Sequence, residues 1–281
     1  NADMLSSDLA TVLSGRYIEF KINSLSFLEF LQFHQLKNTE KSLQRYLKHG
    51  GLPFLYLLPN DDKTVFEYLK NVYNTIFFKD IVSRFNIRNV SFLTDLTKYL
   101  ADNCGSIFSA NSIEKYLKSQ KIKVSYEVII NYLDYLERAF FIHRVKRSEI
   151  GGKKIFEIGE KVYFEDIGLR NSLVGYHIKD IHKIMENVVF NHLKYNDFDI
   201  TIGVNKNTEI DFVATKNTEK IYIQVAYLLK DKETIQREFG NLLKIKDNYP
   251  KYVVSMDKIE TISTYQGIIN LSLKEFLSMK F

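Results

Sequence analysis

The spacing of apolar residues near the start of the chain predicts helices. Phe27, Phe30 and Leu31 form one apolar stripe at helical spacing. The stripe follows a capping box, in which the Ser26 hydroxyl and the Glu29 carboxylate can satisfy free amides at a helix start. Further helical segments are predicted at residues 6–13, 41–48 and 61–89, and the last of these keeps a 3.6-residue period.

Two other parts of the chain have strand patterns. Ile18, Phe20 and Ile22 share one face of an alternating segment, so residues 16–22 are predicted to form a strand. The last third of the chain predicts strands at residues 199–204, 209–214, 220–226, 252–255 and 268–271, with helices at 184–195 and 232–246. Strands joined by a crossover helix imply an α/β region with a mixed sheet.

The middle of the chain predicts three helices followed by a hairpin. The helices are expected at residues 92–101, from residue 109, and from residue 125. The third helix has one apolar side, formed by Ile129, Leu133, Leu136 and Phe140. Two strands are then predicted around a turn at Gly151 and Gly152, with a third strand at residues 161–164. This order is the plan of a winged helix, in which the third helix would recognise DNA and the hairpin would be the wing.

The composition is that of a folded chain of two or three domains, with 281 residues of which 45% are hydrophobic and 26% charged. The single cysteine, Cys104, excludes internal disulfides and cysteine-based zinc clusters, and favours a reducing cytoplasm. No apolar run approaches the roughly 20 residues that span a bilayer, so no membrane partner is expected. The opening residues NADMLSS resemble a tag scar, and we expect that an upstream part of the natural protein is missing.

The net charge of +5 is unevenly distributed. Residues 112–154 contain ten lysines and arginines against five acidic residues. A local basic surplus is typical of a nucleic-acid-binding face, although a solvated surface gives the same pattern. Both interpretations remain open from charge alone.

Three long passages resemble a known family. They are SSDLATVLSGRYIEFKINSLSFLEFL, YLKNVYNTIFFKDIVSRFNIRN, and KVSYEVIINYLDYLERAFFIHRVKR followed by KVYFEDIGLRNSLVG. Together they are similar to bacterial and archaeal predicted AAA+ ATPases that end in a winged helix and a PD-(D/E)XK-like, restriction-endonuclease-like domain. The resemblance covers nearly the whole chain in the expected order.

The resemblance implies an α+β, multidomain fold. Residues 1–90 would be the remnant of the ATPase domain with its helical lid. Residues 91–178 would be the winged helix, and residues 179–281 the α/β endonuclease-like domain with a mixed sheet. The chain would then be a regulatory, DNA-binding part of an ATPase.

The ATP-binding parts of that family are not found in this sequence. No G-x-x-x-x-G-K-[ST] loop is present, so no backbone cradle for nucleotide phosphates is expected. The resemblance therefore implies ATP and Mg²⁺ as cofactors of a full-length protein, and neither in this chain. Arg16 matches a family arginine that could act as an arginine finger on a neighbouring subunit, or it is a surface residue that caps a strand edge.

The resemblance also carries over a partial nuclease site. Glu186 matches the helical acid of the PD-(D/E)XK pattern, and Asp211 matches the strand aspartate. Gln224 and Ala226 occupy the E-x-K positions, which leaves a neutral amide for a carboxylate and no ammonium group. Glu209 could serve as a further metal ligand with Glu186 and Asp211, but divalent-metal binding is expected to be weak. No lysine is expected to stand in for Ala226, and a degenerate, non-cleaving site is predicted. The alternative is a polar hairpin that never carried out chemistry.

Duplex DNA is the predicted partner. Its candidate contacts are Lys115, Lys118, Lys121, Lys123, Arg144, Lys146, Arg147, Lys153 and Lys154. The alternatives are a protein-interaction or oligomerisation platform without nucleic acid, and a metal-dependent nuclease. The third helix is rich in tyrosine and glutamate, which favours the platform over DNA; these residues are Tyr126, Glu127, Tyr132, Tyr135 and Glu137. Self-association is the partner that this alternative implies.

Overall fold

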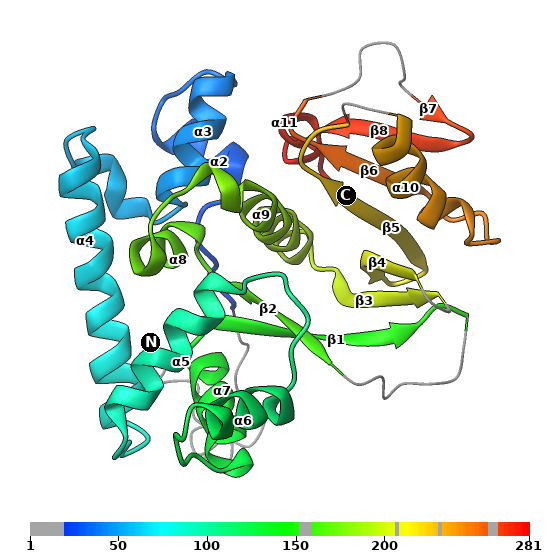
Figure 1. The fold of residues 1–281 in the computed structure, drawn as a ribbon. Helices are drawn as coiled ribbons and strands as arrows, with labels where there is room; N and C mark the ends of the chain where they lie inside the picture. The colour runs from blue at the N-terminus through cyan, green and yellow to red at the C-terminus, as the bar shows by residue number, and fades with distance from the viewer. Residues whose placement is uncertain (1–19, 152–158, 206–207, 230–231, 258–263) are drawn as a thin grey trace.

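The computed structural model describes residues 20–151, 159–205, 208–229, 232–257 and 264–281 (Figure 1). Within these residues no helix is long and apolar enough to cross a membrane. The fold is α+β, with helices gathered around one mixed sheet. The predicted fold class is confirmed at this level.

The sheet contains eight described strands in the order β2-β1-β3-β4-β5-β6-β8-β7. β1 pairs antiparallel with β2 and parallel with β3, while β3, β4 and β5 form an antiparallel series. β6 lies parallel to both β5 and β8, and β7 is a short antiparallel edge. The strands are β1 Ile142–Glu149, β2 Glu160–Phe164, β3 Asp199–Asn205, β4 Thr208–Lys216, β5 Glu219–Ala226, β6 Lys251–Ser255, β7 Thr264–Tyr265 and β8 Ile268–Ser272.

One group of helices precedes the sheet in the chain, a second group lies between and after its strands, and both flank the sheet in space (Figure 1). The first group is α2 Phe27–Phe33, α3 Glu40–His49, η2 Pro53–Leu57, α4 Asp62–Thr75, the π-helical η3 Ile76–Ser83, α5 Val90–Asp102, α6 Ala110–Ser119 and α7 Tyr126–Arg138. The second group is α8 Ile167–Val174, η4 Ile178–Asp180, α9 Ile181–Tyr195, α10 Lys232–Leu243 and α11 Leu273–Phe276. The capping box of Ser26 and Glu29 forms as predicted at the start of α2.

One continuous apolar core extends from Phe27 in α2 to Leu277 beyond α11. A smaller cluster, which includes Phe239 and Leu242, lies under α10. Alternate residues of β5 belong to the two clusters, so the clusters lie on opposite faces of that strand. The larger cluster joins all three predicted domains, whose boundaries remain a prediction.

α8 ties the early helices to the sheet. The buried Asp166 caps α8 by accepting from the Leu169 amide at 3.0 Å, and it also accepts from the Gly51 amide at 2.7 Å. The Asn171 side-chain amide donates to the Leu47 carbonyl oxygen at the end of α3, at 3.0 Å. These buried contacts stabilise one relative position of the helical part and the strand β2.

Three local predictions differ from the structure or fall outside it. The predicted strand at residues 16–22 is wrong over its described part, since residues 20–22 form no strand and Phe20 and Ile22 are exposed. Phe140 was expected on the apolar side of the third helix, but it lies after the end of α7 and is exposed. At Phe140 the backbone adopts a φ of 54°, so the helix does not extend to this residue. The strand predicted just after Gly151 lies mostly outside the described residues, and β1 pairs directly with β2.

Candidate functional site

A lysine ammonium group lies at the centre of the predicted carboxylates. The Nζ atom of Lys161 is 2.8 Å from a Glu186 oxygen, 3.0 Å from a Glu209 oxygen and 3.3 Å from an Asp211 oxygen. The side chains of Lys161 and Glu186 are only 4% and 3% exposed, so this contact lies in the interior of the protein. We call Lys161, Glu186, Glu209, Asp211 and Tyr163 the carboxylate cluster.

Three elements bring the carboxylate cluster together. Lys161 and Tyr163 alternate along β2 and therefore point to the same side of that strand. Glu186 comes from the middle of α9, which packs against β2 and β4. Asp211 lies just beyond the Phe212–Ile223 pair, where the register between β4 and β5 ends. There the Asp211 carboxylate accepts from the Val225 amide at 2.9 Å.

Further contacts hold the Glu186 carboxylate in one orientation. The Tyr163 hydroxyl donates to Glu186 Oε1 at 2.6 Å. Gly105 also lies against this carboxylate, at a φ of 74°, and a Cβ atom there would lie 3.2 Å from it. A side chain at position 105 would therefore crowd Glu186, and the positive φ favours glycine. His182 Nδ1 lies 3.9 Å from Glu186 Oε2, one turn earlier on α9.

Burial and mutual charge decide the protonation of the carboxylate cluster. Burial alone would lower the pKa of Lys161, but the negative charges of Glu186, Asp211 and Glu209 outweigh it and raise that pKa. The Lys161 amine is therefore charged at neutral pH. The pKa of Glu186 is raised by burial and by the charge of Asp211, while Lys161 acts in the opposite direction. Burial and Glu186 raise the pKa of Tyr163 well above its ordinary value, so the phenol remains a hydrogen-bond donor.

The carboxylate cluster does not fit a divalent metal ion in this arrangement. The Lys161 ammonium occupies the position between the carboxylate oxygens that a cation would take. Among the described residues, no group of three or more His, Cys, Asp or Glu side chains is arranged to hold a metal. This arrangement neutralises charge inside the protein, because the Lys161 ammonium group compensates the carboxylates that surround it.

The two departures from the nuclease pattern lie next to the carboxylate cluster on β5. Gln224 is 8% exposed, and its side-chain oxygen has no hydrogen-bond partner within the described part of the chain. Ala226 lines an open cleft of about 350 Å³ together with His182, Thr234, Arg237 and Glu238. Ala226 itself is only 4% exposed at the wall of this cleft.

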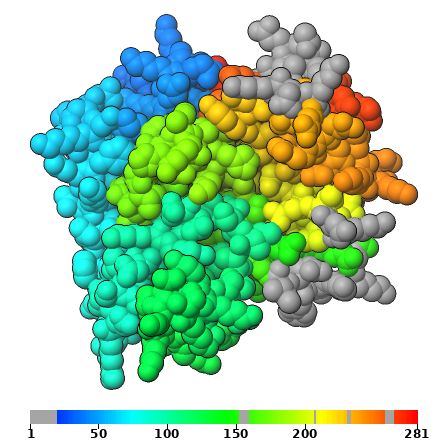
Figure 2. All heavy atoms as spheres, viewed as in Figure 1, coloured from blue at the N-terminus to red at the C-terminus, as the bar shows by residue number. Residues whose placement is uncertain are grey.

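The predicted DNA contacts fall into two groups in the structure. Lys115, Lys118, Lys121, Lys123 and Lys146 are exposed, the first four on α6 and the turn that follows it. Lys118 also pairs with Glu114 at 2.9 Å. Figure 2 shows the α5–α7 region as a lobe at the lower edge of the molecule.

The arginines of the hairpin are engaged by carboxylates. Arg144 donates to Glu160 from Nε at 3.1 Å and from Nη2 at 2.9 Å, and its backbone amide donates to Glu137. Arg147 Nε lies 3.9 Å from Glu209 Oε2, at the edge of the carboxylate cluster. Arg16, Lys153 and Lys154 lie outside the described residues. The hairpin arginines thus have structural contacts that compete with phosphate binding.

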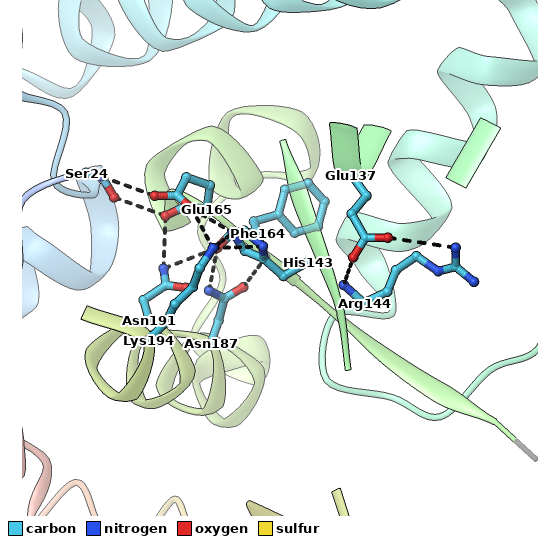
Figure 3. Close-up of polar contacts among 9 residues, drawn as sticks. All are labelled: Ser24, Glu137, His143, Arg144, Phe164, Glu165, Asn187, Asn191 and Lys194. Carbon is cyan, nitrogen blue, oxygen red and sulfur yellow. Dashed lines mark hydrogen bonds and ion pairs between the residues drawn. The ribbon is translucent and has the colours of Figure 1, made fainter. Parts of the chain in front are cut away.

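A second polar network lies at the end of β2 (Figure 3). The Glu165 carboxylate contacts His143 Nε2 at 2.6 Å and Lys194 Nζ at 3.5 Å. It also accepts from the Ser24 amide at 3.2 Å, while the Ser24 hydroxyl donates to the Glu165 carbonyl oxygen at 3.0 Å. Asn191 on α9 donates to the same carbonyl oxygen at 3.0 Å. This network anchors the segment before α2 to the sheet.

Lys161 and Tyr163 were not predicted as site residues. The E-x-K pattern places its ammonium group on β5, whereas Lys161 comes from a strand about 50 residues before Asp211. A usable signal was present, because a lysine inside the short strand EKVYF must find a partner if both faces of that strand are covered. The structure covers both faces, and β2 is buried throughout.

Comparison with protein families shows the family to which the chain belongs. A family model described as "Domain of unknown function (DUF8612)" matches residues 40–180, half of the sequence. The chain belongs to the DUF8612 family. The DUF8612 match begins with α3 and ends at η4, so it includes the lysine-rich α6 and the strand β2 that carries Lys161. Glu186 and Asp211 lie beyond its end.

Longer relatives share most of the chain. An uncharacterized protein of Haemophilus influenzae is 34% identical over 259 residues, which cover 91% of this chain and 64% of that protein. The uncharacterized protein MJ1544 of Methanocaldococcus jannaschii is 30% identical over 246 residues, which cover 82% of this chain and 54% of that protein. The chain therefore spans about three-fifths of the length of these relatives.

A crystal structure of protein VC1899 from Vibrio cholerae covers 77% of this chain and 58% of its own length at 12% identity. Its TM-score of 0.28 is too low to support an argument about the fold or function of this chain.

Proposed function

We propose that this chain is a DNA-binding module that holds phosphates through α6 and the turn after it and does not hydrolyse them. The observation that carries the proposal is the joint exposure of Lys115, Lys118, Lys121 and Lys123. Lysines that contact phosphates release counterions from DNA, which makes binding strong at low salt and weak at high salt.

The order of elements in this region supports the proposal. α5, α6 and α7 are followed by the antiparallel hairpin of β1 and β2, as in a winged helix. An isolated bridge pairs Phe108, just before α6, with Glu160 on β2, and so attaches the helices to the hairpin. The exposed Lys146 on β1 extends the basic surface toward the wing position. We therefore assign residues 91–178 to a winged helix as part of this proposal.

The proposed lack of hydrolysis rests on the carboxylate cluster. Glu186 and Asp211 approach one point, as expected for an endonuclease-like site, but that point is held by Lys161. Metal-dependent cleavage would require the ammonium group to leave three carboxylate oxygens that it contacts within 3.3 Å. Gln224 and Ala226 further reduce the charge available for catalysis. Residues 179–281 are accordingly proposed to be a degenerate PD-(D/E)XK-like region.

The resemblance to AAA+ ATPases places this module in a larger protein. In this proposal the module is the regulatory C-terminal part of such an ATPase, and ATP and Mg²⁺ bind elsewhere in the full-length protein. The greater length of the relatives is compatible with a further domain. The cytoplasm is the compartment that this role implies.

A protein-interaction platform is the second candidate function. The outward side of α7 favours it, since Tyr126 and Glu127 are exposed there and the side chain of Asp134 is half-exposed. Aromatic and acidic side chains on the helix that would enter a DNA groove suit a basic protein partner better than a phosphate backbone.

Fluorescence anisotropy with a labelled DNA tests the proposed function. The probe is a duplex of about 20 base pairs with an unpaired tail of about 20 nucleotides, so that it offers both forms of DNA. Replacement of Lys115, Lys118, Lys121 and Lys123 by Ala should weaken binding at least tenfold. It should also reduce the slope of log affinity against log salt by about 0.7–0.9 for each phosphate that the variant no longer neutralises.

A second quadruple variant controls for the change in net charge. Lys63, Lys70, Lys244 and Lys246 are exposed lysines outside the proposed surface, and their replacement by Ala removes the same charge. This control should retain nearly the wild-type affinity. Equal weakening in both variants, or no binding by the wild type at low salt, would contradict the proposed function and favour the platform.

A further inference from the structure

We propose that the lysine-rich surface binds a single, unpaired DNA strand in preference to a duplex. This inference rests on the proposed function, and it names the form of DNA that the same surface selects. The preference is inferred from the aromatic and aliphatic side chains that alternate with the lysines along the sequence. Unpaired bases present flat faces on which such side chains can stack, whereas the bases of a duplex are already stacked on one another.

The relevant stretch is KYLKSQKIKVSY, residues 115–126. Its four lysines alternate with Tyr116, Ile122 and Tyr126, which are 58%, 46% and 44% exposed. The stretch contains no acidic residue. Exposed aromatic rings interleaved with cations are the combination that tracks an unpaired strand, because each base can stack while each phosphate meets a charge.

The backbone turns back after α6 and returns Ile122 to the end of that helix. α6 ends at Ser119, and Lys121 adopts a φ of 60°, which reverses the chain. The Ile122 amide then donates to the Leu117 carbonyl oxygen at 2.9 Å. This contact returns Ile122 to the last turn of α6, the turn that follows Tyr116. Ile122 therefore lies beside the end of the helix that carries Lys115, Tyr116 and Lys118.

The rings of Tyr116 and Tyr126 are available for stacking. Among the described residues, neither ring is paired with another aromatic ring of the chain. The other tyrosines of α7 differ in this respect, because Tyr135 stacks on Phe85 with ring centroids 4.1 Å apart and Tyr132 contacts Phe92 at 5.8 Å. Tyr116 and Tyr126 thus present apolar ring faces to solvent, whereas comparable rings elsewhere in the protein pack in the core.

The outward side of α7 argues against a duplex. A winged helix reads duplex DNA by placing its third helix in the major groove. Here that helix carries Glu127, Asp134 and Glu137, and Asp134 keeps half of its side chain exposed. Carboxylates brought against two phosphate backbones repel them, so the acid-free stretch before α7 is the favourable path for one strand.

The test compares single strands with a duplex in one buffer by fluorescence anisotropy. The probes are a labelled 20-nucleotide oligothymidine, a labelled 20-base-pair duplex and a labelled 20-nucleotide oligouridine. The wild type should bind oligothymidine about tenfold more tightly than the duplex. The double variant Tyr116→Ala/Tyr126→Ala should weaken oligothymidine binding by on the order of tenfold or more, since each base loses the ring on which it stacks.

Two control variants separate stacking from other effects. Tyr116→Phe/Tyr126→Phe keeps both rings and should bind as the wild type does. Tyr249→Ala removes an exposed tyrosine ring that lies near Lys220, just before β6, and should leave the affinity unchanged. These controls show whether a loss in the double Ala variant comes from the two rings of the lysine-rich stretch.

The failure of this inference can be told from the failure of the proposed function. Salt-dependent duplex binding as tight as that of oligothymidine, with the double Ala variant unaffected, overturns the inference and leaves the DNA-binding function in place. Tighter binding of oligouridine overturns DNA as the source of the strand. Absence of binding to every probe at low salt overturns both proposals.

Discussion

Replacement of Lys161 by Met tests the carboxylate cluster most severely. Methionine keeps an unbranched side chain of similar length and removes only the charge and its hydrogen bonds. Glu186 and Asp211 would then remain buried at 3% and 9% side-chain exposure without the cation that contacts both. Removing one partner of a buried ion pair costs about 3–5 kcal/mol of folding free energy. For a chain of this size the unfolding midpoint should fall by roughly 6–20 °C.

The loss in Lys161→Met should depend on pH. Burial already raises the pKa of Glu186 above that of the unfolded chain, and without the ammonium group of Lys161, which acts in the opposite direction, it rises further. A group whose pKa is raised in the folded state contributes stability at low pH and loses it as pH rises through the folded pKa. The difference from the wild type should therefore be largest near pH 8 and should shrink toward pH 5, where Glu186 takes up a proton.

Urea unfolding monitored by far-UV circular dichroism measures the loss of stability at each pH, since the chain has no tryptophan whose fluorescence could report it. Lys274→Met is the matched control, because Lys274 pairs with Glu40 at the surface and should lose no more than about 1 kcal/mol. Adding Glu186→Gln and Asp211→Asn to Lys161→Met should restore part of the stability. A loss in Lys161→Met no larger than the control, and independent of pH, would refute the assigned role of Lys161.

Two further predictions concern packing and a buried acid. Gly168→Ala should lower the free energy of unfolding by about 3 kcal/mol or more, because the new Cβ atom would lie 1.9 Å from the His49 carbonyl oxygen. Gly240→Ala is the control: Gly240 has open space around it inside α10, so this change should raise the free energy of unfolding by about 0.5–1 kcal/mol. Equal losses of both variants in urea unfolding would contradict this account. Burial raises the pKa of Asp166 to about 6 from 3.8, so its contribution to stability is present below pH 4 and about 3 kcal/mol is lost as pH rises to 6 and above. Asp166→Asn should remove that loss from the pH profile of the unfolding free energy, and an unchanged profile would show that Asp166 does not titrate in this range.

Local patterns in the sequence predicted most elements of the fold. The apolar stripe of α7 places Ile129, Leu133 and Leu136 in the core, as expected from their spacing. The strands β3, β4 and β5 also lie where alternation and turn residues predicted them. The segment at residues 20–22 shows the limit of this approach, since alternation alone produces a strand only when a neighbouring strand pairs with it.

The site could be predicted only in part, because its parts meet through long-range pairing. Glu186 and Asp211 were identified from a motif, and the structure brings them to the same lysine. The parallel pairing of β1 with β3 joins segments separated by about 50 residues, and nothing in either segment specifies the other as its neighbour. That pairing carries β2 and Lys161 into the sheet, so the lysine could not be assigned to the cluster before the topology was known.

A supercoiled-plasmid gel tests the central claim of a DNA-binding module that does not cut. The protein is incubated with plasmid in Mg²⁺ and in Mn²⁺ at low salt. Half of each sample is run in a native gel, and half is run after the protein has been removed. The account predicts that the wild type retards the plasmid and that the plasmid is recovered supercoiled. Recovery of nicked plasmid with the wild type, but not with Asp211→Ala, would contradict it.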